Sequence, residues 1–330
     1  MFDTHYDLLT IAYKAYLTGD YSYLDKISKY FNDNNVTSVI ANLYFMSKDE
    51  MKDEICPNYY QDDVSVLDMF IKAKEVLDTY LPDTKMLYSI EGADYIKDTN
   101  ELEKLYDAGL DSLIICWNTE SKYASGNRSD KGLTQLGREL INKAIDLGMG
   151  IDLSHANKNT FNDLVDLIEE KRSSGIDVVA YASHSNVRSL CDRDRNLDDE
   201  QIERLKSIDG MLGLFSNRSF VIDKSLEDDD KLVKEYYLSH IEYASKIIGF
   251  NNIMVATDDM DFCKDADPEY GTRKIYDYPN INNDLSRDLI NRFGIDITDK
   301  IISGNANKIY NKLKNNREKK RGNIKWLILN

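Results

Sequence analysis

Short apolar runs alternate with longer stretches of helical periodicity along most of the chain. The runs are rich in β-branched and other apolar residues, as strands buried on both faces of a parallel sheet usually are. We identify eight of them, at residues 1–5, 37–45, 85–91, 111–117, 150–155, 178–184, 211–216 and 253–258. The pattern therefore predicts strands that alternate with helices.

The segments between the runs place apolar residues three and four positions apart, which is typical of helices with one buried face. The clearest of these segments are residues 64–81, 134–148, 157–172, 197–208 and 229–248. This alternation predicts an α/β fold, a (β/α)8 TIM-type barrel. A doubly wound open sheet is the alternative, because periodicity does not separate the two. We expect one barrel domain over residues 1–311 and a basic C-terminal tail over residues 312–330.

The charge composition limits the kinds of molecule that the protein is expected to bind. The chain has 330 residues, and 58 acidic against 42 basic side chains give a formal net charge of −16. Nucleic-acid binding is not expected, because a phosphate backbone requires a basic surface. Basic residues gather only at 312–325, where a solvated helix end is favoured over a tether to nucleic acid or lipid.

The N-terminal residues and the cysteines indicate the compartment. Asp3, His5 and Asp7 stand where a signal peptide would be apolar. Runs such as "SLIICW" and "WLIL" are too short to span a membrane. The four cysteines occur singly, at positions 56, 116, 191 and 263, which favours reduced thiols. We therefore expect a cytoplasmic protein without membrane contact.

Isolated polar residues follow five of the apolar runs. They are His5 and Asp7 at the first run, Glu91 at the third, His155 at the fifth, His184 at the sixth and Asp258 at the eighth. Each alone has a structural explanation, as a hydrogen-bonded histidine, a turn residue or a helix cap. In a barrel, however, the carboxyl ends of the strands share one rim, where catalytic residues lie. Together the six residues favour a functional site.

The residue types favour a pair of metal ions. His5 and Asp7 are two apart on extended chain, so their side chains point to the same side and offer part of a zinc ligand set. His155 and His184 offer ligands for a second metal, and Glu91 can bridge the two. Such a pair, about 3.5–4 Å apart, activates a shared water. Asp258 is then available to move a proton.

Motifs of competing classes are absent from the sequence. It contains no GxSxG, HExxH, GxxxxGK[ST] or GxGxxG pattern. "SHS" at 183–185 has no nucleophile elbow around it. His240 lies inside the expected helix 229–248, so we interpret it as structural.

Several longer motifs occur in one order along nearly the whole chain. They are "DTHYDL", "SIEG", "KGLTQLGRELINKAIDLGMGIDLSH", "ASHSNVRSLCDRDRNLDDEQI", "ATDDMD" and "ISGNANKIY". In these motifs the chain resembles the membrane dipeptidase (renal dipeptidase) family of zinc peptidases, which belongs to the amidohydrolase-like barrels. The resemblance implies a zinc-dependent dipeptidase with two Zn²⁺ per chain, a metal-bridging hydroxide as nucleophile, and a homodimer.

The resemblance also implies a role for each site residue. His5 and Asp7 would bind one zinc, His155 and His184 the other, and Glu91 would bridge them. Asp258 would be the catalytic acid/base. Arg195 would bind the C-terminal carboxylate of the substrate, and Trp117 and Asn118 fall at substrate-binding positions.

One departure from the family keeps alternatives open. Many members carry a histidine in a T-H-N motif after the fourth strand, whereas this chain has "IICWN" with Trp117 in that place. Tryptophan can pack over a substrate but cannot act as an acid. The alternatives are a binuclear amidohydrolase for another small amide, a lactam or an N-acyl amino acid, and a degenerate barrel that binds peptides without turnover.

Overall fold

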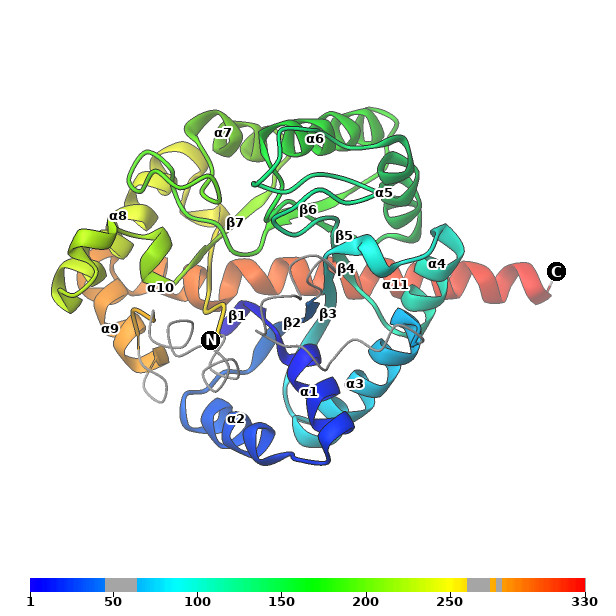
Figure 1. The fold of residues 1–330 in the computed structure, drawn as a ribbon, viewed down its shortest axis with the longest axis horizontal. Helices are drawn as coiled ribbons and strands as arrows, with labels where there is room; N and C mark the ends of the chain where they lie inside the picture. The colour runs from blue at the N-terminus through cyan, green and yellow to red at the C-terminus, as the bar shows by residue number, and fades with distance from the viewer. Residues whose placement is uncertain (45–63, 260–273, 277–280, 330) are drawn as a thin grey trace.

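Eight parallel strands form a single sheet in the order β1-β2-β3-β4-β5-β6-β7-β8. The computed structural model describes residues 1–44, 64–259, 274–276 and 281–329, with residues 321–329 described by their backbone alone (Figure 1). The strands are β1 (Phe2–Tyr6), β2 (Ser38–Tyr44), β3 (Lys85–Glu91), β4 (Ser112–Ile114), β5 (Gly150–Asp152), β6 (Val179–Ala182), β7 (Met211–Phe215) and β8 (Ile253–Ala256). Each coincides with one of the apolar runs.

The sheet closes on itself through contacts between β1 and the end of β8. The backbone N–H of Asp258 donates to the carbonyl of His5 at 3.1 Å, and the Thr4 hydroxyl donates to the carbonyl of Val255 at 3.0 Å. The Asp3 carboxylate accepts the N–H of Thr257 at 2.9 Å. The predicted (β/α)8 barrel is therefore confirmed, and the open-sheet alternative is excluded.

Helices surround the barrel of strands (Figure 1). They are α1 (Leu8–Thr18), α2 (Ser22–Asp33), α3 (Val66–Tyr80), α4 (Thr99–Ala108), α5 (Gln135–Leu147), α6 (Lys158–Ser173), α7 (Asp199–Ser207), α8 (Asp230–Ile248), α9 (Ile281–Phe293), α10 (Ile295–Asp299) and α11 (Asn305–Leu329). The five segments expected to be helical are confirmed as α3, α5, α6, α7 and α8. In α5, the Thr134 hydroxyl caps the first turn, and Gly148 ends the helix at φ 82°.

Four strands end two or three residues earlier than the sequence pattern predicts. β4, β5, β6 and β8 end at residues 114, 152, 182 and 256 instead of 117, 155, 184 and 258. Asp152 explains part of this difference, because its Oδ1 accepts the backbone N–H of both Ser154 and Ser183 at 3.0 Å. The carboxylate thereby replaces the next ladder bonds. His155 and His184 consequently lie on loops just beyond their strands.

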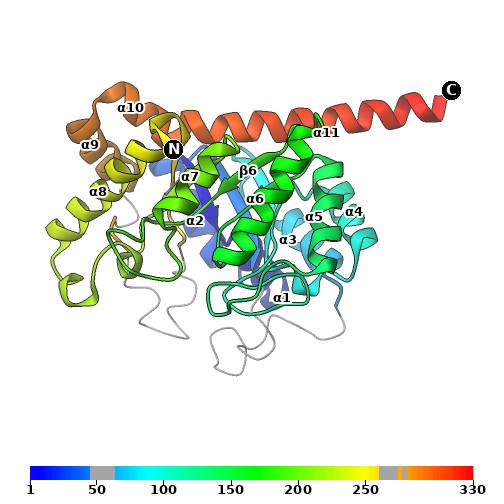
Figure 2. The same ribbon diagram turned by 90° about the horizontal axis from the view of Figure 1, so that it is seen from above.

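The amino end of the barrel is covered by α11, which crosses it and extends past the barrel (Figure 2). Ile309 and Leu313 of this helix pack on a small apolar cluster with Phe2, Tyr181 and Met254 from the strands. Farther along, Lys314 and Arg317 form ion pairs with Asp111. Helix α11 therefore runs without a break through residue 312. The division between a domain of residues 1–311 and a tail of residues 312–330 stays a prediction.

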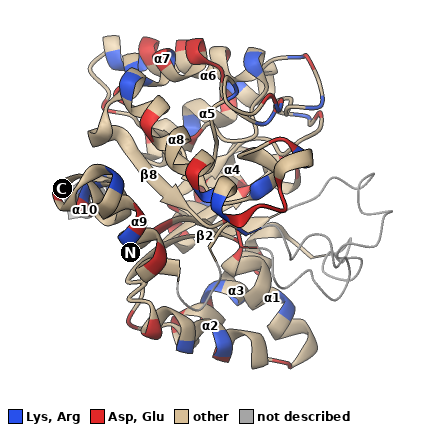
Figure 3. Cartoon of the chain, turned by 90° about the vertical axis from the view of Figure 1, so that its left-hand side faces the viewer, with Lys and Arg blue, Asp and Glu red and all other residues tan. Residues whose placement is uncertain are grey.

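The surface mixes acidic and basic positions (Figure 3). At the start of α6, for example, Lys158 pairs with Asp198 at 2.9 Å and with Glu200 at 2.7 Å. Among the described residues, no helix combines the length and the apolar character needed to cross a membrane. Cys116 and Cys191 are free and buried, and Cys56 and Cys263 lie outside the described residues.

Candidate metal centre

The six polar residues that follow the apolar runs come together at the carboxyl end of the barrel. His5 lies within β1, and Glu91 is the last residue of β3. The other four lie just beyond strand ends: Asp7 after β1, His155 after β5, His184 after β6 and Asp258 after β8. Sites in barrels of this type are built at this end.

Glu91 stands between two histidines from opposite parts of the sheet. Its Oε2 lies 2.8 Å from Nε2 of His5, and its Oε1 lies 2.6 Å from Nε2 of His155. Nε2 of His184 lies 2.9 Å from Nε2 of His155 and 3.8 Å from Glu91 Oε1. Each oxygen of one carboxylate thus faces a different imidazole, an arrangement that a bridging ligand requires.

The other carboxylates lie on the His5 side. Asp7 Oδ1 and Asp258 Oδ1 are each 3.8 Å from His5 Nε2. His5, Asp7 and Asp258 form one set of ligand atoms within 4.8 Å of one another, and His5, Glu91 and His184 form another. Both His5 and Asp7 were expected on extended chain, but only His5 lies in the strand, because Asp7 is the N-cap residue of α1. The two side chains still approach each other on the same side.

Burial makes the charges of this cluster interdependent. Burial lowers the pKa of His5, but the carboxylates of Glu91, Asp258 and Asp7 outweigh this effect and raise the pKa to about 10. Burial favours the neutral form of Glu91, but His5 and His155 hold the pKa of this carboxyl well below its usual range. The cluster therefore favours an ionised bridging carboxylate with positive charge beside it.

His155 and His184 favour the neutral form. Burial, assisted by the positive charge of Arg195, lowers the pKa of His155 to about 4. Burial and the positive charge of His5 hold the pKa of His184 well below its ordinary value. Neutral imidazoles are the form that binds metal ions.

The hydrogen bonds of His155 show that the residues fit a metal ion. Its Nδ1 lies 2.9 Å from the amide oxygen of Asn118, which accepts the Nδ1 proton. In the neutral ring, Nε2 then presents a lone pair to Glu91 Oε1 at 2.6 Å. Two acceptors at this distance need a positive charge between them. Imidazole nitrogens with carboxylate oxygens are a donor set that zinc accepts.

Two of the site residues hold a left-handed backbone. His155 has φ 65° and Asp258 has φ 51°. Such angles are unfavourable for residues with a side chain, and they occur disproportionately at functional sites. Neighbouring strands hold Asp258 in place through its hydrogen bond to the His5 carbonyl.

Arg195 reaches the site from the segment between β6 and α7. Its guanidinium is buried, donating to Ser185 Oγ at 2.9 Å and to the His184 carbonyl at 2.7 Å. The ring of Phe215 lies 5.7 Å from the guanidinium carbon. The structure therefore brings Arg195 beside the histidine cluster.

Trp117 and Asn118 follow β4 on the same rim. The ring of Trp117 lies 6.1 Å from that of His155 and contacts Tyr44 edge-on at 5.2 Å. Arg128 covers part of the indole, with its guanidinium carbon 5.8 Å from the ring centre. Asn118, expected at a substrate-binding position, has its amide oxygen 2.9 Å from His155 Nδ1.

The sequence analysis missed four residues that contact the histidines of the site or the backbone beside them. Asn42 Nδ2 lies 3.0 Å from His5 Nδ1, and the Ser183 hydroxyl lies 2.8 Å from His184 Nδ1. Asp3 and Asp152 brace the backbone next to His5 and His184. For three of them the motifs "DTH", "DLSH" and "SHS" were the available signal, because each puts a hydrogen-bonding residue within three positions of a histidine. Asn42 lies in none of these motifs.

His240 is confirmed as a structural residue. It is fully buried, its Nδ1 accepts the N–H of Val187 at 3.0 Å, and its Nε2 lies 2.8 Å from the carbonyl of Val221. Both ring nitrogens are therefore satisfied by backbone groups.

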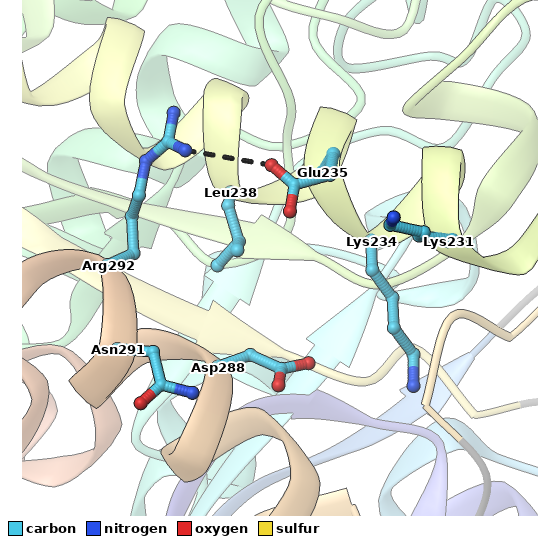
Figure 4. A pocket seen from close by; sticks show the side chains of 7 residues that line it. All are labelled: Lys231, Lys234, Glu235, Leu238, Asp288, Asn291 and Arg292. Atoms are coloured by element: carbon cyan, nitrogen blue, oxygen red, sulfur yellow. Dashed lines mark ion pairs between the residues drawn. The ribbon is translucent and has the colours of Figure 1, made fainter.

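A surface cavity of about 340 Å³ lies between α8 and α9 (Figure 4). It is lined by Lys231, Lys234, Glu235, Leu238, Asp288, Asn291 and Arg292. Arg292 pairs with Glu235 at 3.6 Å, and the lining includes none of the predicted site residues. The cavity thus shares no lining residue with the candidate metal centre.

Comparison with known sequences identifies the family of the chain. A sequence model of the membrane dipeptidase family (peptidase family M19) matches residues 54–323. The chain therefore belongs to the membrane dipeptidase family, a family of peptide-bond hydrolases. The matched residues include all predicted site residues except His5 and Asp7, which the fold brings to the same place.

Individual relatives are distant. An uncharacterised protein of Acinetobacter calcoaceticus is 28% identical over 163 residues, which cover 47% of this chain and 49% of that protein. Dipeptidase aclJ of Aspergillus oryzae is 24% identical over 220 residues, or 64% of this chain and 47% of that protein. The matches thus span about half the length of these two curated relatives.

Solved structures share the fold over nearly the whole chain. A metallopeptidase of Rhodobacter sphaeroides, solved with a phosphinate mimic of the dipeptide L-Ala-D-Ala, superimposes with a TM-score of 0.70. It is 17% identical, and the match covers 95% of this chain and 98% of that chain. At this identity the likeness supports the fold alone.

Proposed function

We propose that this protein is a zinc-dependent dipeptidase that hydrolyses short peptides at a binuclear site. The observation that carries the proposal is the position of Glu91. Its two oxygens lie 2.8 Å and 2.6 Å from Nε2 of His5 and His155. A carboxylate so placed between two imidazoles suits a bridge between two metal ions. Membership in the membrane dipeptidase family supports the same conclusion.

In this proposal, His5 and Asp7 would hold one zinc ion, His155 and His184 would hold the other, and Glu91 would serve both. The distances between His155, His184 and Glu91 Oε1, all 3.8 Å or less, support the second set. Bound zinc would supply Lewis acidity, which polarises a carbonyl and lowers the pKa of water. Every other part of the reaction depends on the side chains around the site.

Asp258 is proposed as the residue that moves the proton. Its side chain is 17% exposed, more than those of His5, Asp7 and Glu91, so it is the carboxylate of the cluster most accessible to solvent. Burial raises the pKa of Asp258 above its ordinary value, which makes the carboxylate a stronger base. Its Oδ1 would take the proton of the attacking water and donate it to the leaving amine nitrogen.

Arg195 is proposed to bind the C-terminal carboxylate of the substrate. Its guanidinium has five N–H groups, and two of its nitrogens already donate to Ser185 and to the His184 carbonyl. These bonds fix the guanidinium plane, and the remaining donors can meet a carboxylate. A free carboxylate bound this close to the metal ligands would restrict cleavage to very short peptides.

The names of relatives support a dipeptide substrate. The Aspergillus oryzae relative is a dipeptidase, and the Rhodobacter sphaeroides structure holds a dipeptide mimic. Trp117 would pack against the substrate beside His155, and Asn118 would act by orienting that histidine. A cytoplasmic location, a homodimer and the absence of nucleic-acid and membrane partners stay predictions.

Trp117 favours one alternative to a dipeptide substrate. An indole beside the metal ligands offers an apolar wall and no acid, which also suits a lactam, an N-acyl amino acid or another small amide as substrate of the same binuclear centre. A barrel that binds peptides without turnover is the remaining alternative, and the close convergence of the six site residues speaks against it.

The test combines zinc content with hydrolysis of a panel of dipeptides and N-acyl amino acids. We expect near two zinc ions per chain and dipeptide turnover in the wild type, with both lost in Glu91→Gln. Glu103→Gln is the matched control, because Glu103 is a surface residue paired with Lys143. Turnover of N-acyl amino acids without turnover of dipeptides would keep the zinc site and change the assigned substrate. Absence of bound zinc would overturn the proposal.

A further inference from the structure

The Ser183 hydroxyl lies between two of the proposed metal ligands. Its Oγ is 2.8 Å from Nδ1 of His184 and 3.3 Å from Nδ1 of His5. The rings of these histidines are stacked, with centroids 3.5 Å apart and planes inclined by 28°. Ser183 and His5 are fully buried, and His184 is 1% exposed. One oxygen atom therefore touches the outward nitrogens of both rings.

The chemistry of the His184 ring assigns the direction of its bond. An imidazole that binds a metal through Nε2 carries its proton on Nδ1 and needs an acceptor there. A serine oxygen has two lone pairs, so Ser183 Oγ can accept the N–H of His184 while its own proton goes to a third group. At His5, the amide nitrogen of Asn42 lies 3.0 Å from Nδ1, closer than Ser183 Oγ at 3.3 Å.

Two groups beside Ser183 can take that proton. Ser154 Oγ lies 3.3 Å from Ser183 Oγ, and the Asp152 carboxylate also forms a hydrogen bond with the Ser183 side chain. Asp152 further accepts the backbone N–H of Ser183 at 3.0 Å, which fixes the position of that residue. An ionised carboxylate accepts and does not donate, so it directs the hydroxyl proton away from the histidines.

We propose that Ser183 is a positioning residue that accepts the Nδ1 proton of His184 and so turns Nε2 of that ring toward Glu91. The inference rests on the proposed metal site and names a residue that acts on one half of it. His155 has its own acceptor in Asn118, so both histidines proposed for the second zinc then have an oxygen at Nδ1.

The test compares Ser183→Ala with Ser112→Ala. Ser112 is also a fully buried serine of the barrel, but it lies at the amino end of β4, away from the histidines. Zinc affinity is measured by competition with a chromophoric chelator, and the unfolding temperature of each metal-free variant is measured in parallel. We expect Ser183→Ala to lose about 10- to 100-fold in zinc affinity, as removal of an outer hydrogen-bond partner typically does. Ser112→Ala should bind as the wild type does.

A second readout follows the protons directly. The chain has only four histidines, so ¹⁵N-histidine spectra of the zinc-loaded protein can be assigned. We expect a protonated Nδ1 atom for His184 in the wild type and in Ser112→Ala. Equal zinc affinity in Ser183→Ala and the wild type, or an unprotonated Nδ1 at His184, would overturn the inference. Failure of the wild type to bind zinc would instead overturn the proposed function.

Discussion

Two clusters of buried charge lie at opposite ends of the barrel, and they differ in how their charges are satisfied. At the amino end, Asp111 meets Lys314 at 2.8 Å and Arg317 at 3.2 Å, and it accepts the N–H of Tyr88 at 3.0 Å. At the carboxyl end, three carboxylates and three imidazoles converge, and acceptor atoms face one another.

The difference separates a structural cluster from a ligand site. Each charged side chain of the Asp111 cluster has a partner of opposite charge. The Arg317 guanidinium also donates to the carbonyls of Tyr106 and Leu110. Such a cluster ties α11 to the barrel and needs nothing else. At the rim, His155 Nε2 and Glu91 Oε1 need a positive charge between them, which a metal ion would provide. Burial alone therefore does not mark a site, whereas acceptor atoms that face one another and need a cation between them do.

The largest effect is expected from the bridging carboxylate. Glu91→Gln removes the charge shared by both halves of the site, so zinc should no longer stabilise the protein. For the wild type, zinc at 100 times its dissociation constant should add about 2.7 kcal/mol to the free energy of unfolding. Thermal unfolding with and without zinc measures this difference. A zinc-dependent shift of wild-type size in Glu91→Gln would contradict the assignment.

At the amino end, a substitution is expected to lower stability without changing zinc binding. Asp111→Asn leaves two cations without their carboxylate, which should lower the free energy of unfolding by about 3 kcal/mol. Zinc stoichiometry should stay unchanged, because the site lies at the other end of the barrel. Denaturant unfolding and metal analysis give both values. Asp177→Asn is the control, since its exposed pair with Lys312 should contribute less than about 1 kcal/mol.

A smaller effect is expected from the residue proposed to bind the substrate carboxylate. Arg195→Lys keeps the charge but removes the planar fork, so kcat/KM for dipeptides should fall by about 10- to 100-fold, mainly through KM. Steady-state kinetics on a dipeptide and on its C-terminal amide measure the effect. The exposed Arg188, paired with Asp192 and Asp194, provides the control Arg188→Lys. An equal loss for the amide would contradict carboxylate binding.

The smallest effect is expected at Trp117. Trp117→Phe keeps an aromatic ring beside His155 but removes part of the wall, so the ratio of kcat/KM between bulky and small dipeptides should change by about 3- to 10-fold. Zinc content should be unaffected. A competition assay with a mixture of dipeptides measures the ratio. Loss of zinc in this variant would show that the indole supports the metal centre instead of the substrate.

The sequence predicted the barrel and the convergence of its rim residues for a physical reason. Runs buried on both faces are apolar throughout, so a histidine or carboxylate at the end of such a run stands out, as Glu91 does after "KMLYSI". In a closed parallel sheet all those ends share one rim. His5, His155 and Glu91 could therefore be grouped without coordinates, although their metal-binding roles stay a proposal.

Other features depended on contacts that no local pattern encodes. Ser183 meets His5 across 178 residues of chain, and the contact exists only because β1 and β6 are brought together by the closed barrel. The early ends of β5 and β6 follow from one side chain, Asp152, which binds backbone on both segments. Asp111 and Arg317 likewise meet only after α11 has folded across the amino end.

The central claim is that Glu91 bridges two zinc ions, and anomalous diffraction at the zinc edge from crystals of the zinc-loaded protein tests it most directly. The account predicts two anomalous peaks, one beside His5 and Asp7 and one beside His155 and His184, with one Glu91 oxygen bound to each. A single peak, or two peaks that Glu91 does not join, would contradict it.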